Sequence, residues 1–310
     1  MSARDIAVEN LNLAIDDLRG QGFRLDIIYP ADEPRTAVMS RNGEEVRLTT
    51  PGAPPLPKGL PAFAPEFVLT RAGATPGQGR AGMFYRDLIP NRLGGRYIAS
   101  HITLPRGGPV ADWVHYHRIV LQMIYVRRGW VRVVYEDQGE PFVMNEGDLV
   151  LQPPEIRHRV LESSPGLEVI EIGAPALHES LADHELVLPN GERSGRSFGG
   201  QRFLRHVAMA TPWTPFLGAE AQETRMFEAT GRLAEVRTIR SAGTDEIRFP
   251  AHDGELVFGF VLDGAAALDG TALKAGDAFA IPPAREWNLG DMTSDLRLLH
   301  VMTARLDAAA

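Results

Sequence analysis

The chain repeats itself, and a repeat of this kind means that one architecture is folded twice. The first copy reads HYHRIVLQMIYVRRGW followed by EGDLVLQPPEIRH, and the second reads PAHDGELVFGFVLDGA followed by AGDAFAIPPAREW. The matched pairs are His117 with His252 and Gly129 with Gly264, both 135 residues apart, then Gly147 with Gly276, Pro153 with Pro282 and His158 with Trp287, all 129 residues apart. Two constant offsets with one short deletion between them indicate internal duplication.

Each copy consists of short apolar runs separated by turn residues. The chain has 31 Gly and 23 Pro among its 310 residues, and they separate runs such as Arg96–Leu104, Met123–Val126, Trp130–Tyr135 and Leu149–Leu151. Short strands with turn signals at this spacing are typical of a sandwich or barrel, so we predict an all-β fold. Helical periodicity is clearest over Val8–Leu18, and a short helix is also predicted over Pro175–Asp183.

The repeats lie behind an N-terminal arm. Arg24–Leu48 predicts a pair of strands joined at Asn42-Gly43, and the proline-rich segment 51–65 predicts an extended chain. We expect the strand pair to extend a barrel sheet, most simply that of the second barrel. The expected ranges are 1–78 for the arm, 79–176 for the first barrel, 177–205 for a connector and 206–310 for the second barrel.

Charge and cysteine content exclude several classes of protein. The formal net charge is −8, which argues against a nucleic-acid surface, and the chain has no Cys, which excludes thiolate metal sites and cysteine nucleophiles. No secretory signal and no apolar run long enough for a membrane span is visible. We therefore expect a cytoplasmic protein with no nucleic-acid or membrane partner, and we expect a homodimer in which sheet edges or the arm meet a second barrel.

Three histidines of the first copy have the spacing of a metal site. His115 and His117 are two residues apart, so on a strand both side chains point to the same face. Gln122 follows at the start of the next apolar run, and His158 comes after the Gly147 turn and the Pro153-Pro154 pair. Imidazole is a common ligand of divalent transition metals, so His115, His117, His158 and Gln122 are the predicted metal ligands.

The order of these residues resembles the cupin superfamily. The pattern H-x-H-x4-Q-x6-G followed by G-x5-P-x-E-x2-H matches its two motifs in spacing, with Gln122, Glu155 and Glu162 standing where the family usually has Glu, Gly and Asn. The resemblance covers roughly residues 80–175 and 223–303. It implies two small β-barrels, a bicupin, with a metal at the mouth of the first.

The second copy has lost most of the ligand pattern. Pro250, Val257 and Trp287 replace the first His, the Gln and the last His, while His252 remains and Glu255 lies nearby. We expect this barrel to hold no metal and Trp287 to fill the former site.

The ligand set predicts the class of chemistry. Three neutral imidazoles with a neutral amide leave a divalent ion its full charge, which favours an anionic chelating substrate. Fe(II) is the favoured ion, with Zn, Ni or Mn as alternatives. The resemblance to three-histidine cupins implies an Fe(II) dioxygenase that cleaves a small aromatic or β-dicarbonyl compound. The alternatives are a non-oxidative metal-assisted isomerase, cyclase or lyase, and a non-catalytic cupin that binds a small ligand.

Overall fold

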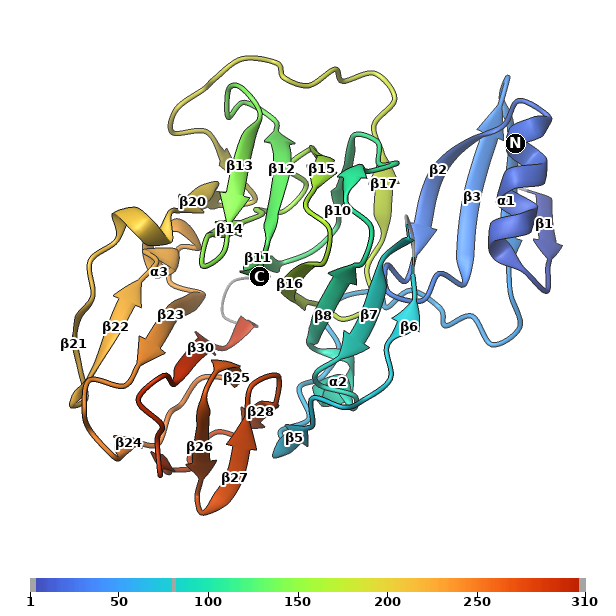
Figure 1. Ribbon diagram of the computed structural model, residues 1–310. Helices are drawn as coiled ribbons and strands as arrows, with labels where there is room; N and C mark the ends of the chain where they lie inside the picture. Colours follow the sequence, from blue (N-terminus) through green and yellow to red (C-terminus); the bar gives the residue numbers. More distant parts are fainter. Residues whose placement is uncertain (1–3, 80–81, 307–310) are drawn as a thin grey trace.

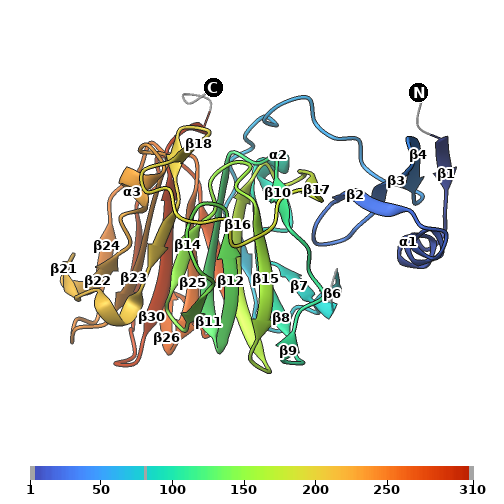
Figure 2. The same ribbon diagram turned by 90° about the horizontal axis from the view of Figure 1, so that it is seen from above.

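Two β-barrels lie side by side in the computed structural model, and a small α/β arm lies at the outer edge of the first (Figure 1). The structure describes residues 4–79 and 82–306. Seen from above, the arm lies beside β17, and the sheets of the two barrels are stacked against each other in the middle of the molecule (Figure 2). The all-β prediction is confirmed.

The arm is a small sheet covered by one helix. The helix α1 spans Leu11–Gly20 and is capped by the Asn10 side chain, which accepts a hydrogen bond of 3.1 Å from the Leu13 N–H. Its apolar side packs on the arm sheet. The strands of this sheet are β1 (Arg4–Ala7), β2 (Arg24–Tyr29), β3 (Thr36–Arg41) and β4 (Glu44–Thr49). The predicted turn at Asn42-Gly43 joins β3 to β4, and β2 is a further strand.

The arm joins the first barrel, and the prediction that it joins the second was wrong. Strand β2 pairs with β17 (Ser180–Ala182), which in turn pairs with β10 (His115–His117). The strand that receives the arm, β17, lies in the segment 175–183 that was predicted to be a helix. The sequence therefore showed no free strand edge of the first barrel to which the arm could bind. Only Ser180–Ala182 of that segment is a strand, because β2 and β10, both distant in sequence, pair with its two edges, and no part of the segment is helical.

The first barrel is built from two sheets that face each other. The sheet continuous with the arm contains β9 (Gly108–Pro109), β10, β12 (Trp130–Tyr135), β13 (Phe142–Asn145), β15 (His158–Ser163) and β17. The other contains β6 (Gly77–Gln78), β7 (Phe84–Asp87), β8 (Ile98–Leu104), β11 (Leu121–Arg128), β14 (Leu149–Leu151), β16 (Leu167–Ala174) and β20 (Leu204–His206). A short helix α2 (Arg92–Gly95) precedes β8.

The second barrel has the same two-sheet plan. The larger sheet contains β5 (Val68–Thr70), β21 (Thr214–Phe216), β22 (Ala219–Glu223), β23 (Ala234–Arg240), β25 (Val257–Asp263), β28 (Ala278–Ile281) and β30 (Arg297–Thr303). The smaller contains β24 (Ile247–Phe249), β26 (Ala265–Leu268), β27 (Thr271–Lys274) and β29 (Trp287–Gly290). The connecting segments carry β18 (Ser197–Phe198), β19 (Gln201–Arg202), the 3-10 helix η2 (Ala208–Ala210) and α3 (Met226–Ala229).

Each barrel receives a strand from outside its own stretch of sequence. Strand β5 follows the proline-rich segment and pairs with β28 of the second barrel. Strand β20 lies at the end of the expected connector and pairs with β14 of the first barrel. Sheet membership therefore crosses the ranges expected from the sequence.

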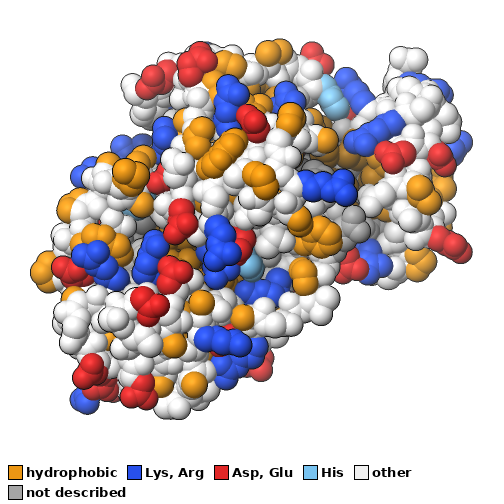
Figure 3. Space-filling view, viewed as in Figure 1, with side chains coloured by type: hydrophobic (Ala, Val, Ile, Leu, Met, Phe, Trp, Pro, Cys, Tyr) orange, Lys and Arg blue, Asp and Glu red, His pale blue; other side chains and the backbone are white. Residues whose placement is uncertain are grey.

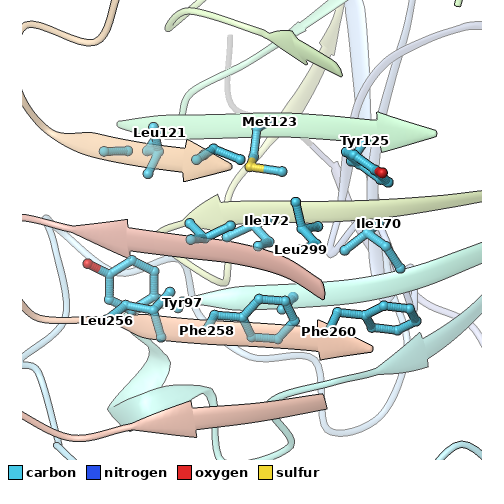
Figure 4. Packing of buried hydrophobic residues seen from close by; sticks show 14 of the residues in the cluster. Tyr97, Leu121, Met123, Tyr125, Ile170, Ile172, Leu256, Phe258, Phe260 and Leu299 are labelled. Carbon is cyan, nitrogen blue, oxygen red and sulfur yellow. The ribbon is translucent and has the colours of Figure 1, made fainter. Parts of the chain in front are cut away.

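The largest apolar core lies between the barrels (Figure 4). Met123, Tyr125 and Ile170 from β11 and β16 of the first barrel pack against Phe258 and Phe260 of β25 in the second, and all five are essentially inaccessible to solvent. Burial of apolar area on this scale is the main stabilising contribution to a fold. Each barrel also has an apolar core of its own.

Acidic and basic side chains are interspersed on the face of the molecule shown in Figure 3. Among the described residues, every helix is too short to span a lipid bilayer.

Candidate metal centre

Two neighbouring strands bring the three histidines of the first barrel together. His115 and His117 lie on β10 and face inward, and His115 is the direct antiparallel partner of His158 on β15. One ligand atom from each ring lies within 4.8 Å of those of the other two, and all three side chains are buried. The nearest pair of ring centroids, His115 and His158, is 4.3 Å apart. The alternation of side chains on a strand thus produces the convergence that the spacing predicted.

The outer nitrogen of each ring is held in place. His115 Nδ1 donates to the carbonyl of Trp113 at 2.8 Å, and His158 Nδ1 donates to the carbonyl of Ile156 at 3.0 Å. His117 Nδ1 lies 3.0 Å from Ser180 Oγ on β17. A carbonyl oxygen only accepts, so Nδ1 carries the proton in the first two rings, and Nε2 is the unprotonated nitrogen that would bind a metal ion. Metal-binding histidines are usually oriented by such a bond.

An acidic group accompanies the cluster. Asp112 Oδ1 lies 3.5 Å from His115 Nδ1, and Asp112 Oδ2 accepts a hydrogen bond of 2.8 Å from the Val160 N–H. This carboxylate is buried beside the ring that it faces. It adds negative charge next to a site that would hold a cation, which fits a cationic occupant.

Gln122 lies in the same cavity as the histidines, and its amide is held by a carboxylate. Its Nε2 donates to Glu171 Oε1 at 2.6 Å, so the amide oxygen is turned away from that carboxylate. Coordination by Gln122 stays a prediction. The sequence analysis did not identify Glu171, although the sequence contains a signal for it. In the strand Leu167–Ala174, the inward-facing positions are otherwise apolar, and Glu171 is the acid among them.

The histidines open into a small cavity inside the first barrel. Its volume is about 100 Å³. One part of the wall is polar, formed by His115, His117, His158, Gln122, Gln152 and Glu171, and the rest is apolar, formed by Met83, Tyr85, Ile102, Leu104, Ile124, Val131, Val133, Tyr135, Met144, Val160, Leu167 and Val169. The Tyr135 ring stacks on His158, and burial raises the pKa of its phenol, which keeps the phenol neutral.

Three other polar residues of the first barrel lie away from this cavity. Arg157 points outward, where it pairs with Asp183 at 3.1 Å and covers the Tyr116 ring. Glu155 occupies a turn with a φ of 60° near Arg118. His101 lies between the barrels, where it bonds Glu168 at 2.8 Å.

The corresponding part of the second barrel is filled by aromatic rings. Trp287 is buried and stacks on Phe249 with ring centroids 3.7 Å apart, as predicted for a side chain that fills the former site. Glu255 does not approach this space. It bonds Arg96 and Tyr97 of the first barrel instead.

Comparisons with known proteins identify the fold. No protein-family model matches the sequence, and no curated protein matches it. Oxalate decarboxylase from Bacillus subtilis matches with a TM-score of 0.56 and 14% identity over 79% of this chain and 77% of its own. A Trp-to-Phe variant of the same protein gives a TM-score of 0.57 and 13% identity over 79% and 78% of the two chains. Protein Ylba from E. coli gives 0.55 and 12% identity over 79% and 93%.

The chain therefore has the fold of a duplicated cupin, a bicupin. Its two tandem cupin barrels differ in their interiors, because the first contains a buried three-histidine cluster and the second contains a stack of aromatic side chains.

Proposed function

We propose that this chain is a metal-dependent enzyme in which His115, His117 and His158 hold a divalent cation. The observation that carries this proposal is the convergence of three buried imidazoles whose outer nitrogens are fixed by Trp113, Ser180 and Ile156. When bound, such an ion supplies Lewis acidity and, as Fe(II), can react with O₂. The neutral donors favour an anionic, chelating substrate.

The size of the cavity supports one of the two expected substrate classes over the other. An apolar cavity of about 150 Å³ accommodates a benzene ring. The cavity here is about 100 Å³ and would have to accommodate both the ion and the substrate. We therefore favour an Fe(II) dioxygenase that cleaves a small β-dicarbonyl compound, rather than one that opens an aromatic ring.

Glu171 gives this cavity a proton acceptor. A β-dicarbonyl compound chelates best as its enolate, which forms when the carbon between the two carbonyls loses a proton. The Glu171 carboxylate lines the cavity and has one oxygen on the Gln122 amide. In the proposed reaction Glu171 takes that proton, and Gln122 keeps the carboxylate in position.

The same acceptor supports a second candidate, a non-oxidative isomerase, cyclase or lyase. Proton transfer from a polarised substrate needs a base and a Lewis acid but no O₂. The B. subtilis protein with a similar fold is named oxalate decarboxylase, and a decarboxylase is a lyase. This supports the second candidate only by analogy of fold.

A pair of histidine variants tests the metal centre. Protein prepared without O₂ in the presence of Fe(II) should hold about one ion per chain, and His117→Ala should reduce this at least tenfold. His252→Ala is the matched control, since His252 occupies the corresponding sequence position in the second barrel and should leave the metal content unchanged. Equal metal loss in both variants would contradict the assignment.

Substrate panels then separate the reactions. O₂ consumption with aliphatic β-dicarbonyl compounds but not with dihydroxybenzoates is the expected result. Turnover without O₂ would favour the lyase or isomerase. If the metal-loaded protein binds a compound tightly but forms no product, the third alternative is favoured, a non-catalytic cupin that binds a small ligand.

A further inference from the structure

The polar and apolar parts of the first-barrel cavity lie at opposite ends of its strands. On β16, Glu171 faces the histidine end, whereas Leu167 lies four residues away and pairs with Leu104. On β12, Tyr135 pairs with His158, whereas Val131 lies at the other end and pairs with Met144. Four residues of strand span about 13 Å along the backbone, and side chains from both levels reach into the same small cavity. The cavity wall therefore changes from polar to apolar along the barrel.

The apolar end is defined here by Met83, Leu104, Val131, Met144 and Leu167. All five side chains are buried, and all line the same cavity as the histidines. Among the residues described in this wall, Glu171, the histidines and Tyr135 belong to the other end, whereas the Tyr85 hydroxyl donates to the Met83 sulfur at 3.4 Å. Met83 and Met144 add flexible thioethers that adjust to the shape of an apolar group.

We propose that the apolar end is a binding subsite for a short saturated chain of the substrate. This inference rests on the proposed metal centre, which would hold the chelating head of the same molecule. The substrate class becomes a small chelator with an aliphatic substituent and no second charge at its far end. A distal carboxylate would lose its hydration and find no cationic partner among the residues that form this end.

The volume limits the length of that chain. A six-carbon ring occupies a cavity of about 150 Å³. The cavity of about 100 Å³ must also hold the ion and the chelating head, so it leaves room for a chain of only about two or three carbons. Each methylene that enters the subsite should strengthen binding about fourfold, until the chain no longer fits.

Straight-chain carboxylates test the subsite independently of the reaction. The protein is loaded with Zn²⁺, which is redox-inert, and its metal content is measured first. Calorimetric titration with the series from acetate to octanoate should then show affinity rising about fourfold per carbon to an optimum near propionate or butyrate. Succinate should bind at least about tenfold more weakly than butyrate, because it buries a second charge. A flat series, or succinate binding as tightly as butyrate, would overturn the subsite.

Two methionine variants locate the effect. Met144→Ala removes three side-chain heavy atoms from the apolar end and should move the optimum to longer carboxylates. Met123→Ala is the matched control, because Met123 is equally buried but packs in the core between the barrels. Leu104→Ala replaces Met144→Ala if the latter fails to fold. An equal shift in the variant and the control would contradict the assignment.

Failure of the metal centre and failure of the subsite give different results. If no ion is bound, the proposed function fails, and the same series on metal-free protein still measures the gain per methylene. If the ion is bound but chain length has no effect, the metal centre stands and the subsite is wrong.

Discussion

At the scale of single residues, the three histidines are held by bonds of different origin. His115 and His158 each donate to a carbonyl two residues earlier in the chain, so β10 and β15 orient these two rings locally. His117 depends on Ser180, which β17 supplies from much later in the sequence. The orientation of His117 therefore depends on the pairing of β17 with β10.

Replacing that hydroxyl should weaken the metal centre without unfolding the barrel. Ser180→Ala removes the hydroxyl that lies 3.0 Å from His117 Nδ1, and loss of such an orienting group typically lowers metal affinity about 10- to 100-fold. Affinity is measured by competition with a chelator of known strength.

A serine on β15 provides the control for this prediction. Ser163 is equally buried, but its Oγ has no hydrogen-bond partner among the described residues. Ser163→Ala should leave metal affinity unchanged and should not lower stability. Unchanged affinity in Ser180→Ala would show that Ser180 does not orient His117.

At the scale of strands, the sequence predicted those elements whose limits are set locally. Trp130–Tyr135 and Leu149–Leu151 are strands with the predicted bounds, because Gly129 and Gly147 adopt positive φ in the turns that precede them. The His115–His117 alternation likewise predicted a shared face. Ser180–Ala182 could not be recognised as a strand, since its partners are distant in sequence. Glu171 was missed because its role depends on which face of β16 is inward.

Polar and charged side chains link four neighbouring strands, β7, β8, β16 and β11, where the barrels meet. Glu168 on β16 accepts from His101 on β8 at 2.8 Å and also pairs with Arg127 on β11. Arg86 donates to the other nitrogen of His101 at 3.3 Å, and burial lowers the pKa of His101 and keeps its ring neutral. The hydrogen bond from His101, together with the charge of Arg127, lowers the pKa of Glu168 from 4.5 to about 2.

This shift predicts an acid-sensitive contribution to stability. A carboxylate with a lowered folded-state pKa stabilises the fold above pH 4.5, and the contribution is lost as the pH falls towards 2. Glu168→Gln should lower the free energy of unfolding by about 2 kcal/mol at neutral pH and much less near pH 2. Denaturant titrations across this range measure the difference. Glu246→Gln, in an exposed pair with Arg248, is the control and should change stability little. A pH-independent loss in Glu168→Gln would contradict the charge-based explanation.

At the scale of the whole molecule, the barrels are joined so extensively that they should unfold together. Strands β5 and β20 connect each barrel to a segment outside its own repeat, and the largest apolar core belongs to both barrels. A buried ion pair lies in the same contact, where Arg96 binds Glu255 through two hydrogen bonds of 2.9 and 2.6 Å. The repeat predicted two barrels but not this connection, because residues such as Arg96 and Glu255 match nothing in the other copy.

A double-mutant cycle on this ion pair tests whether the contact couples the two barrels. Removing one partner leaves the other charge buried without compensation, so Arg96→Met and Glu255→Met should each cost about 3–5 kcal/mol in the free energy of unfolding. The double variant should cost much less than the sum, because an apolar pair replaces both charges and Tyr97 retains its 2.8 Å hydrogen bond to Thr303. Calorimetry should show one unfolding transition for the native chain and the double variant. Additive costs, or a native chain whose barrels melt separately, would mean that the contact does not couple the two barrels.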